Sequence, residues 1–322
     1  MPRILLIKTS SLGDVVHNLP VASDIATRLP GAILDWVAEE AFADIPALHP
    51  SVSSVLPVAT RRWRKTLGRA ATWREMRRFR RRLQSHTYDV VLDTQGLVKS
   101  AVIARLARGV RCGQDKTSAR EPLAARFYDR AYPVARGRHA VVRNRELAAL
   151  AFGYAMPTTP PDYGLVLPAE PLPPELARDY VVCLHGTSRA SKLWPPAHWV
   201  AFADALLQKG LTPLLPWGDN AERARAEAIH AACPGVRVLP RMSLRGLAVV
   251  LGHARAVVGV DTGLLHLAGA LDRPVVGIYT GSDPQLTGVY PHDPARVANL
   301  GGFGQVPAVE EVLAALNRVS EK

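Results

Sequence analysis

The 322-residue sequence has few cysteines and no long hydrophobic run. Its three cysteines, Cys112, Cys183 and Cys233, have neither the number nor the spacing of a disulfide framework or a zinc site, so we expect a reducing, cytoplasmic location. No segment approaches the ~18 uninterrupted apolar residues that a membrane-spanning helix needs. The opening residues, MPRILLIKTSSLGD, lack the apolar core of a signal peptide because Lys8 interrupts them.

The remaining composition is that of a globular protein, with 48% hydrophobic and 21% charged residues, which excludes disorder, collagen-like repeats and coiled coil. The length predicts about two domains. Apolar runs alternate with helical patterns in both halves, as in parallel sheets with crossover helices. Seven prolines between residues 157 and 174 favour an extended connection. We predict an α/β fold of two doubly wound domains, 1–160 and 161–322, with ligand loops at the strand ends and a cleft between the domains in which a substrate could be held.

Short apolar runs that end in small or polar residues indicate the individual strands. In the first domain we expect strands at 4–7, 33–37, 55–58 and 89–93, and helices at about 15–29 and 95–107. In the second domain we expect strands at 180–184, 211–215, 236–239, 256–260 and 274–279. Its helices are predicted to begin near Pro196 and to cover 221–232, 244–252 and most of 261–271.

Positive charge is concentrated in the first half. Residues 1–160 carry 26 Lys or Arg against 13 Asp or Glu, whereas residues 161–322 carry 14 against 15. Segment 61–83, RRWRKTLGRAATWREMRRFRRRL, holds eleven basic residues and one acid, Glu75, and we predict that its Trp and Phe residues can lie at a lipid interface. Such a segment suits nucleic acid, an anionic membrane surface or a phosphorylated substrate, and a merely solvated basic face is the alternative.

The loop KTSSLGDVVH leaves the first predicted strand and carries a carboxylate, Asp14. This residue could cap the helix that follows, or it could act as a general base at the cleft. His17, one helical turn later, is a competing base.

Two loops of the second domain offer groups that bind phosphate. HGTSRASKLWP supplies the hydroxyls of Thr187 and Ser188 with the cation of Lys192, although it could be a plain surface loop. It lacks the P-loop pattern GxxxxGK[ST]. In VVGVDTGLLHLAGAL, a strand ends at Asp261, and Thr262 and Gly263 open a helix that carries His266. Amides at a helix N-terminus favour phosphate, whereas the alternative is an N-cap and a core histidine. No GxGxxG fingerprint accompanies them.

Two further residues follow strands of the second domain. The segment LPWGDNAERA follows a strand and places Glu222 at the start of a helix, where it could complement the helix dipole or accept hydrogen bonds from a sugar hydroxyl. Met242 could pack on an aromatic base or simply fill a gap in the core.

As a set, KTSSLGDVVHNLP, RRWRK, DTQGLVKS, SAREPLA, KLWPPAHW, LPWG and VGVDTGLLHLAGALDRP resemble the ADP-heptose:lipopolysaccharide heptosyltransferases of glycosyltransferase family 9. The resemblance spans Met1 to about Pro284 and is strongest to the members that add the first heptose to the Kdo region of the inner core. It implies a GT-B fold, in which two Rossmann-like domains face a central cleft, and an inverting reaction without metal or other cofactor. It also implies that the last helix, Val309–Val319, packs back on the first domain.

The resemblance also implies roles for single residues. Asp14 would be the base toward the Kdo hydroxyl, and Lys192 would assist departure of ADP. Donor binding would involve Thr187, Ser188, Lys192, Glu222, Met242, Asp261, Thr262, Gly263 and His266. Acceptor binding would involve Ser10, Ser11, Gly13, Arg61, Arg62, Arg64 and Arg120.

The implied partners are ADP-L-glycero-β-D-manno-heptose, Kdo2-lipid A and the anionic cytoplasmic face of the inner membrane. We expect a monomer that binds no nucleic acid. The alternatives are a heptosyltransferase II or III acting on a later core sugar and, in another class, a basic nucleic-acid-binding protein.

Overall fold

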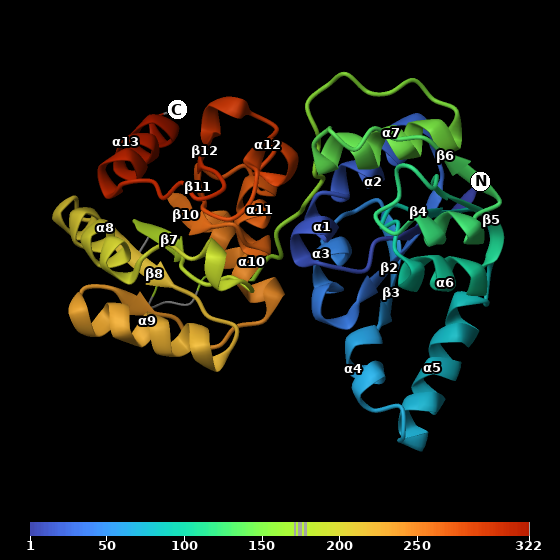
Figure 1. Ribbon diagram of the computed structural model, residues 1–322, viewed down its shortest axis with the longest axis horizontal. Coiled ribbons are helices and arrows are strands. Elements are labelled where there is room, and N and C mark those ends of the chain that lie inside the picture. Colours follow the sequence, from blue (N-terminus) through green and yellow to red (C-terminus); the bar gives the residue numbers. More distant parts are fainter. Residues whose placement is uncertain (171, 173–175, 177–178, 322) are drawn as a thin grey trace. The chain divides into compact units, whose positions relative to one another are not determined.

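The computed structural model describes residues 1–170, 172, 176 and 179–321 of the chain. The chain divides into two compact units, Met1–Val166 and Leu167–Lys322. Each unit contains a six-stranded sheet in which all strand pairs are parallel, with helices between the strands (Figure 1). Among the described residues, no helix is both long enough and apolar enough to cross a membrane.

The sheet of the N-terminal unit has the strand order β3-β2-β1-β4-β5-β6. Its strands are β1 (Arg3–Ile7), β2 (Ile33–Glu39), β3 (Val52–Val58), β4 (Thr87–Asp93), β5 (Arg108–Gln114) and β6 (Arg130–Tyr132). The four predicted strands are confirmed with shifted ends. β5 and β6 were not predicted, because RGVRCGQ and RAY interrupt their apolar residues with arginine, glycine or glutamine.

The helices of this unit are α1 (Leu12–Val16), α2 (Leu19–Arg28), α3 (Asp44–Ala47), α4 (Thr60–Lys65), α5 (Ala70–Leu83), α6 (Val98–Leu106) and α7 (Ala140–Phe152), with 3₁₀ turns η1 (Glu40–Phe42) and η2 (Pro122–Phe127). The single helix predicted over 15–29 is therefore wrong. The structure breaks it at His17–Asn18, and Pro20 lies in the first turn of α2, where its missing N–H is tolerated.

The basic segment forms two helices, α4 and α5, which project from the unit and meet in a short turn at residues 66–69 (Figure 1). The prediction that its aromatic residues lie at a surface is wrong for Trp63 and Phe79. Both are buried in the core cluster of the N-terminal unit, with ring centroids 5.8 Å apart. Only Trp73 remains exposed, at 48%.

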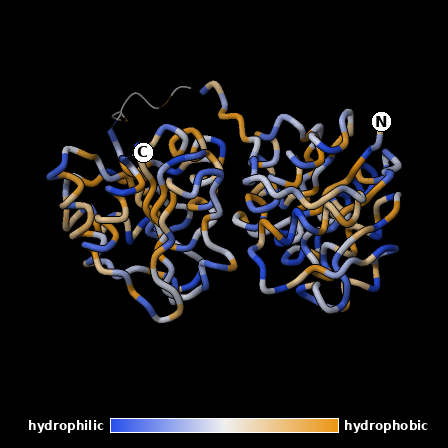
Figure 2. The backbone as a smooth tube through the Cα atoms, turned by 90° about the horizontal axis from the view of Figure 1, so that it is seen from above, coloured by the Kyte–Doolittle hydropathy of each residue, from blue (hydrophilic) through white to orange (hydrophobic). Residues whose placement is uncertain are grey.

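The sheet of the C-terminal unit has the order β12-β11-β10-β7-β8-β9. Its strands are β7 (Tyr180–Leu184), β8 (Thr212–Leu215), β9 (Arg237–Val238), β10 (Ala256–Val260), β11 (Val275–Tyr279) and β12 (Val297–Gly301). β7 and β10 lie where the sequence predicts them, and all ten of their residues are buried. Figure 2 shows hydrophobic segments in the interior of this unit. β12 was not predicted, because VANLG has a polar residue and a glycine in five positions.

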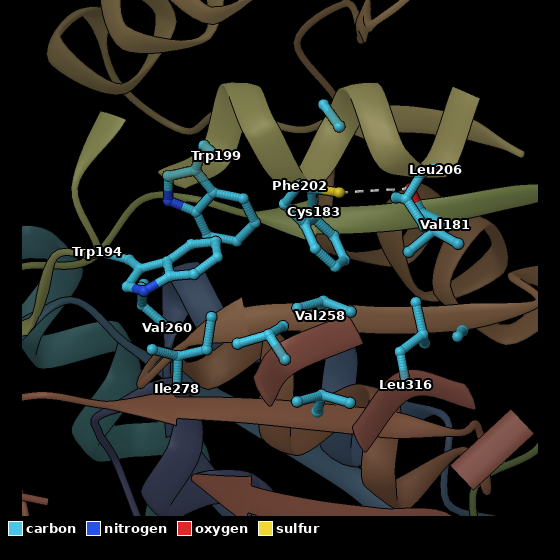
Figure 3. Packing of buried hydrophobic residues seen from close by; sticks show 14 of the residues in the cluster. Val181, Cys183, Trp194, Trp199, Phe202, Leu206, Val258, Val260, Ile278 and Leu316 are labelled. Carbon is cyan, nitrogen blue, oxygen red and sulfur yellow. Dashed lines mark hydrogen bonds between the residues drawn. The ribbon is translucent and has the colours of Figure 1, made fainter. Parts of the chain in front are cut away.

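Helices cover this sheet: α8 (Pro196–Gln208), α9 (Asn220–Ala232), α10 (Leu244–His253), α11 (Gly263–Ala270), α12 (Pro284–Thr287) and α13 (Val309–Ser320), with 3₁₀ turns η3 (Ala190–Lys192) and η4 (Pro294–Arg296). Trp194 and Trp199 cross at 90° in the core between α8 and the sheet (Figure 3). α13 packs on β10, β11, β12 and α8 and buries Val312 and Leu316 in the same core. The expectation that this helix packs back on the first domain stays a prediction.

Candidate functional site

Each sheet has one place where the strand order reverses, and the candidate residues follow the strands at those places. In the N-terminal unit the reversal lies between β1 and β4, and in the C-terminal unit it lies between β7 and β10. Loops that leave the carboxyl ends of two such strands diverge to opposite faces of the sheet and open a crevice for a ligand. The loops at residues 8–11, 94–97, 185–192 and 261–262 are therefore the candidate site loops.

Gln95, at the end of β4, holds the loop that leaves β1. Its Oε1 accepts hydrogen bonds from the backbone N–H of Thr9 (2.7 Å) and of Ser10 (3.2 Å), and its Nε2 donates to the Ser10 carbonyl. All three residues are buried, so these bonds are shielded from competing water. Gln95 thus fixes the backbone of Thr9 and Ser10 in the loop that leads to Asp14, a role that the sequence alone does not reveal.

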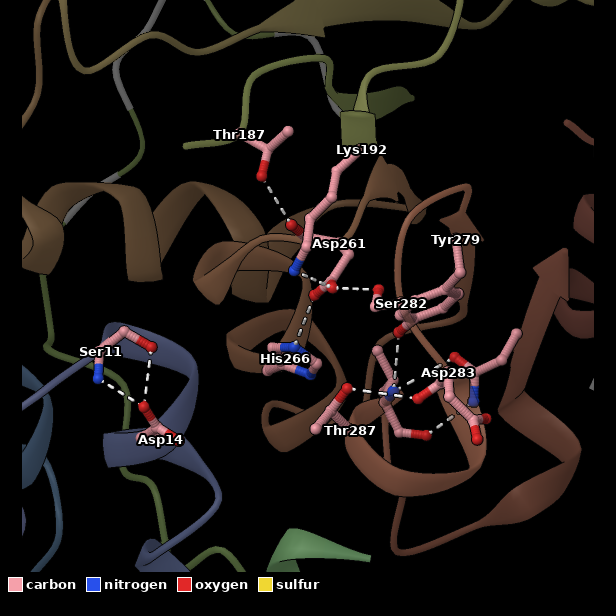
Figure 4. Close-up of polar contacts among 12 residues, drawn as sticks. Ser11, Asp14, Thr187, Lys192, Asp261, His266, Tyr279, Ser282, Asp283 and Thr287 are labelled. Carbon is pink, nitrogen blue, oxygen red and sulfur yellow. Dashed lines mark hydrogen bonds and ion pairs between the residues drawn. The ribbon is translucent and has the colours of Figure 1, made fainter. Parts of the chain in front are cut away.

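Asp14 is half-buried at the start of α1, with Gly13 beside it (Figure 4). Its Oδ2 accepts hydrogen bonds from the backbone N–H of Ser11 at 2.6 Å and from the Ser11 hydroxyl at 3.0 Å. The capping role considered for this aspartate is therefore present. It does not exclude base chemistry, because within the described residues the bonded oxygen is Oδ2 and no hydrogen bond to Oδ1 is found.

Beneath this loop lie two buried ionisable side chains, Lys8 and Asp93. Lys8 Nζ donates to the Thr94 carbonyl at 2.8 Å, and Tyr128 donates its hydroxyl proton to Asp93 Oδ2 at 2.8 Å. Burial lowers the pKa of Lys8, although the charges of Asp14 and Asp93 oppose the shift. Burial likewise raises the pKa of Asp93, against its hydrogen-bond donors.

A second lysine, Lys99, lies beside the same loop on α6 and was not predicted as a site residue. Its Nζ donates to the Ser10 hydroxyl at 2.9 Å. Burial and the positive charge of Arg61 lower the pKa of Lys99, while Glu39, Asp14 and Glu121 act in the opposite direction. An anion beside Lys99 and Arg61 would be attracted by both positive charges. In the sequence, Lys99 was marked only by its place in DTQGLVKS, one of the segments that carry the family resemblance.

The arginines predicted to bind the acceptor differ in their contacts. Arg62 binds Glu40 and Glu75, each at 2.9 Å, so its guanidinium already has two carboxylate partners. Arg61 lies over the Phe42 ring, 5.3 Å from its centroid. Arg64 and Arg120 are exposed. Glu75 also accepts a hydrogen bond from Trp63 Nε1 at 2.9 Å, so this acid braces α4 against α5.

In the C-terminal unit Asp261 is the centre of a compact polar cluster (Figure 4). Its Oδ2 binds Lys192 Nζ at 2.5 Å and the Ser282 hydroxyl at 2.5 Å, and its Oδ1 is 3.6 Å from His266 Nε2. Burial alone would raise the pKa of Asp261, but hydrogen bonds from His266, Lys192 and Ser282 hold it well below its usual range. Ser282, which follows β11, was missed because the sequence does not show that its loop returns to Asp261.

The two predicted phosphate-binding loops meet at this cluster. Thr187 donates its hydroxyl proton to the Asp261 carbonyl at 2.9 Å, which ties the loop after β7 to the loop after β10. Thr262 is the N-cap of α11 without a side-chain cap bond, and Gly263 is its first residue. Ser188 is exposed on the same loop as Thr187. Thr187, Lys192, Thr262 and Gly263 thus gather hydroxyl, ammonium and amide donors, which together suit a diphosphate.

The structure brings Glu222 to this edge of the sheet but leaves Met242 apart from the cluster. Glu222 Oε2 accepts from the Gly218 backbone N–H at 2.7 Å, and its carboxyl group lies against Gly186 in the loop after β7. Met242 lies half-buried in the loop after β9, and its methyl group is near Gly246. No group of three or more His, Cys, Asp or Glu suited to a metal ion is found in the described part of the chain.

Comparison with known proteins identifies the class. The structure of "E. coli heptosyltransferase WaaC with ADP" superposes with a TM-score of 0.88 at 43% sequence identity, and the match covers 99% of both chains. The same protein with ADP-2-deoxy-2-fluoro heptose gives a TM-score of 0.83 at 42% identity, over 99% of this chain and 98% of that one. The chain therefore has the GT-B fold and is a glycosyltransferase.

Sequence comparison identifies the family. The profile of glycosyltransferase family 9 (heptosyltransferase) matches residues 76–313. Lipopolysaccharide heptosyltransferase 1 of Pseudomonas aeruginosa is 50% identical over 293 residues, which cover 89% of this chain and 81% of that protein. The chain belongs to glycosyltransferase family 9, the heptosyltransferases.

Proposed function

We propose that this chain transfers L-glycero-D-manno-heptose from its ADP-β-linked form to the Kdo region of Kdo2-lipid A, with inversion at the anomeric carbon. The observation that carries this proposal is the Asp261–Lys192 cluster beside the start of α11, in a chain similar to an enzyme solved with ADP. The 50% identity to a heptosyltransferase 1 favours the first heptose over the later ones of the alternative. Membership in a glycosyltransferase family favours an enzyme over a nucleic-acid-binding protein.

On the acceptor side, Asp14 removes the proton of the Kdo hydroxyl as its oxygen attacks the anomeric carbon. Ser11 orients the carboxylate through its two hydrogen bonds, and Gln95 fixes the preceding backbone. A carboxylate with one oxygen held and the other free can accept a proton in a defined direction. Lys99 and Arg61 supply positive charge for the carboxylate groups of the acceptor.

On the donor side, the bond between the anomeric carbon and the diphosphate breaks, and ADP leaves with the electron pair. Lys192 and the amides at the start of α11 stabilise the charge that develops on the leaving oxygen. Asp261 holds Lys192 in position. Glu222 accepts hydrogen bonds from the ribose hydroxyls, and Met242 packs against the adenine. These fixed donors supply the charge stabilisation in a reaction that we expect to need no metal ion.

The anionic acceptor is held by the basic residues of the N-terminal unit. All eleven Lys and Arg residues of segment 61–83 are exposed. We expect them, with Arg120, to bind the phosphates of lipid A and the cytoplasmic face of the inner membrane, since each basic residue near an anionic surface contributes ~1 kcal/mol. When the salt concentration rises, the acceptor KM should therefore increase and vesicle binding should weaken.

The decisive experiment offers the purified protein ADP-heptose together with Kdo2-lipid A and follows the product by mass spectrometry. A mass increase of one heptose residue on Kdo2-lipid A supports the proposal. UDP- and GDP-sugars serve as donor controls. Kdo2-lipid A that already carries the first heptose tests the alternative, and transfer only to that acceptor would show a later-acting heptosyltransferase.

A further inference from the structure

The turn between α4 and α5, together with the start of α5, presents two large apolar side chains to solvent. Leu67 is 47% exposed and Trp73 is 48% exposed. Trp73 Nε1 donates to the Leu67 carbonyl at 2.8 Å, so the indole is fixed against the turn. Gly68, between them in sequence, has open space where a Cβ would lie. The turn therefore carries an ordered apolar tip, which consists of Leu67 and Trp73.

The base of the same helix pair is built differently. Trp63 and Phe79 pack edge-to-face inside the core of the N-terminal unit, and Leu83 is fully buried. These residues anchor α4 and α5 to the unit, while Glu75 ties the two helices together through Arg62 and Trp63. Leu67 and Trp73 of the apolar tip do not belong to the core cluster that anchors the helix pair.

Positive charge surrounds the tip. Lys65 precedes the turn and Arg69 is its last residue, and Arg64, Arg74 and Arg77 are exposed on the adjoining helices. Of the eleven basic residues in segment 61–83, Arg62 is the one that forms an ion pair within the described part of the chain. Exposed Trp and Leu within a cationic collar complement a surface with anionic headgroups above an apolar layer. Tryptophan is favoured at that boundary, because its ring is apolar and its N–H is polar.

We propose that the apolar tip inserts into an anionic lipid bilayer, with Leu67 and Trp73 below the headgroups and the flanking Lys and Arg side chains on the lipid phosphates. The inference deepens the proposed function, on which it rests, because a lipid-linked acceptor lies in such a bilayer. The inference assigns membrane contact to the apolar tip. Electrostatic attraction alone would instead distribute that contact over all the basic residues of segment 61–83.

Insertion is tested with vesicles of phosphatidylglycerol and phosphatidylethanolamine. Leu67→Ser and Trp73→Ala should each reduce co-sedimentation about tenfold, as expected when one large apolar side chain no longer enters lipid. Leu150→Ser on α7, which removes a side chain that is 42% exposed, is the matched control and should bind as wild type. Lipids brominated in the acyl chain should quench wild-type tryptophan emission but not that of Trp73→Phe.

Two outcomes would overturn the insertion. One is wild-type vesicle binding by both tip variants, and the other is equal quenching of wild type and Trp73→Phe. Wild-type binding to single-stranded RNA that both tip variants lose would likewise assign the tip to another partner. A water-soluble, deacylated acceptor separates the two proposals: the tip variants should keep wild-type kcat with it. If the wild-type protein glycosylates neither the deacylated acceptor nor the lipid-embedded one, the proposed function is wrong, whereas the vesicle-binding result still decides the insertion.

Discussion

In the proposed mechanism Asp14 has both of the roles that the sequence offered as alternatives, helix cap and general base. Its Oδ2 caps α1 through Ser11, and the same contacts orient the carboxylate. Asp14→Asn keeps the shape but removes the basic oxygen, so we expect kcat to fall ~10²–10⁴-fold with ADP affinity unchanged. Initial rates and the thermal shift with ADP measure the two quantities. Asp44→Asn, at an exposed aspartate, is the control. A variant that retains more than a tenth of wild-type kcat would remove Asp14 from the role of base.

Lys192 is the cation that Asp261 holds at the start of α11. Lys192→Ala removes the ammonium group, and we expect a loss of ~10²–10³-fold in kcat/KM for the donor, since a fixed donor at the leaving group acts most strongly in the transition state. Acceptor KM should change little. Steady-state kinetics with each substrate varied in turn distinguish these effects, and Lys209→Ala on an exposed lysine is the control. Unchanged donor kinetics would refute the assignment.

Among elements, the loop after β1 depends on the loop after β4. Gln95→Ala deletes the hydrogen bonds that fix Thr9 and Ser10, so we expect Asp14 to lose its alignment and kcat to fall by up to ~10²-fold. The ADP thermal shift should stay at the wild-type value, because the donor residues lie in the other unit. Gln84→Ala, which also removes a side-chain bond to a backbone carbonyl, is the control. Equal kcat values for the two variants would show that Gln95 has no positioning role.

The sequence predicted well those elements whose own residues form a clear hydrophobic pattern. β7 and β10 are uninterrupted apolar runs that end in polar loops, and both are fully buried. β6 and β12 lie at sheet edges, where one side of the strand needs no apolar cover, and their sequences therefore look like loops. The same limit applies to the site: Asp14 and Asp261 follow strands and were predicted, whereas Gln95, Lys99 and Ser282 act through contacts between segments distant in sequence.

At the scale of the whole molecule, stability should depend on pH through a histidine in the C-terminal unit. Burial, assisted by the charge of Arg225, lowers the pKa of His185 to about 4. The unfolded chain, with a histidine pKa near 6.5, binds this proton more readily than the folded chain does. The contribution to stability is therefore complete above pH ~6.5 and is lost as the pH falls toward ~4.

Over that interval this one group accounts for up to ~3 kcal/mol of unfolding free energy. Urea unfolding followed by tryptophan emission between pH 4 and pH 7.5 measures the slope. His185→Gln should flatten it, whereas His86→Gln, at an exposed histidine, should leave it unchanged. An identical slope in wild type and His185→Gln would contradict the expectation.

The projecting pair α4 and α5 also makes the chain a substrate for proteases that prefer basic residues. Trypsin cleaves after lysine and arginine, and eleven such residues lie between positions 61 and 82. A protease cleaves backbone that is locally unfolded, and helical residues are protected from it. The exposed turn at 66–69 should therefore be cleaved first, after Lys65 or Arg69. A fragment pattern on a gel would therefore report how often this turn opens. Anything that covers the turn would be seen as a slower cut at this point, with the remaining tryptic sites as an internal reference.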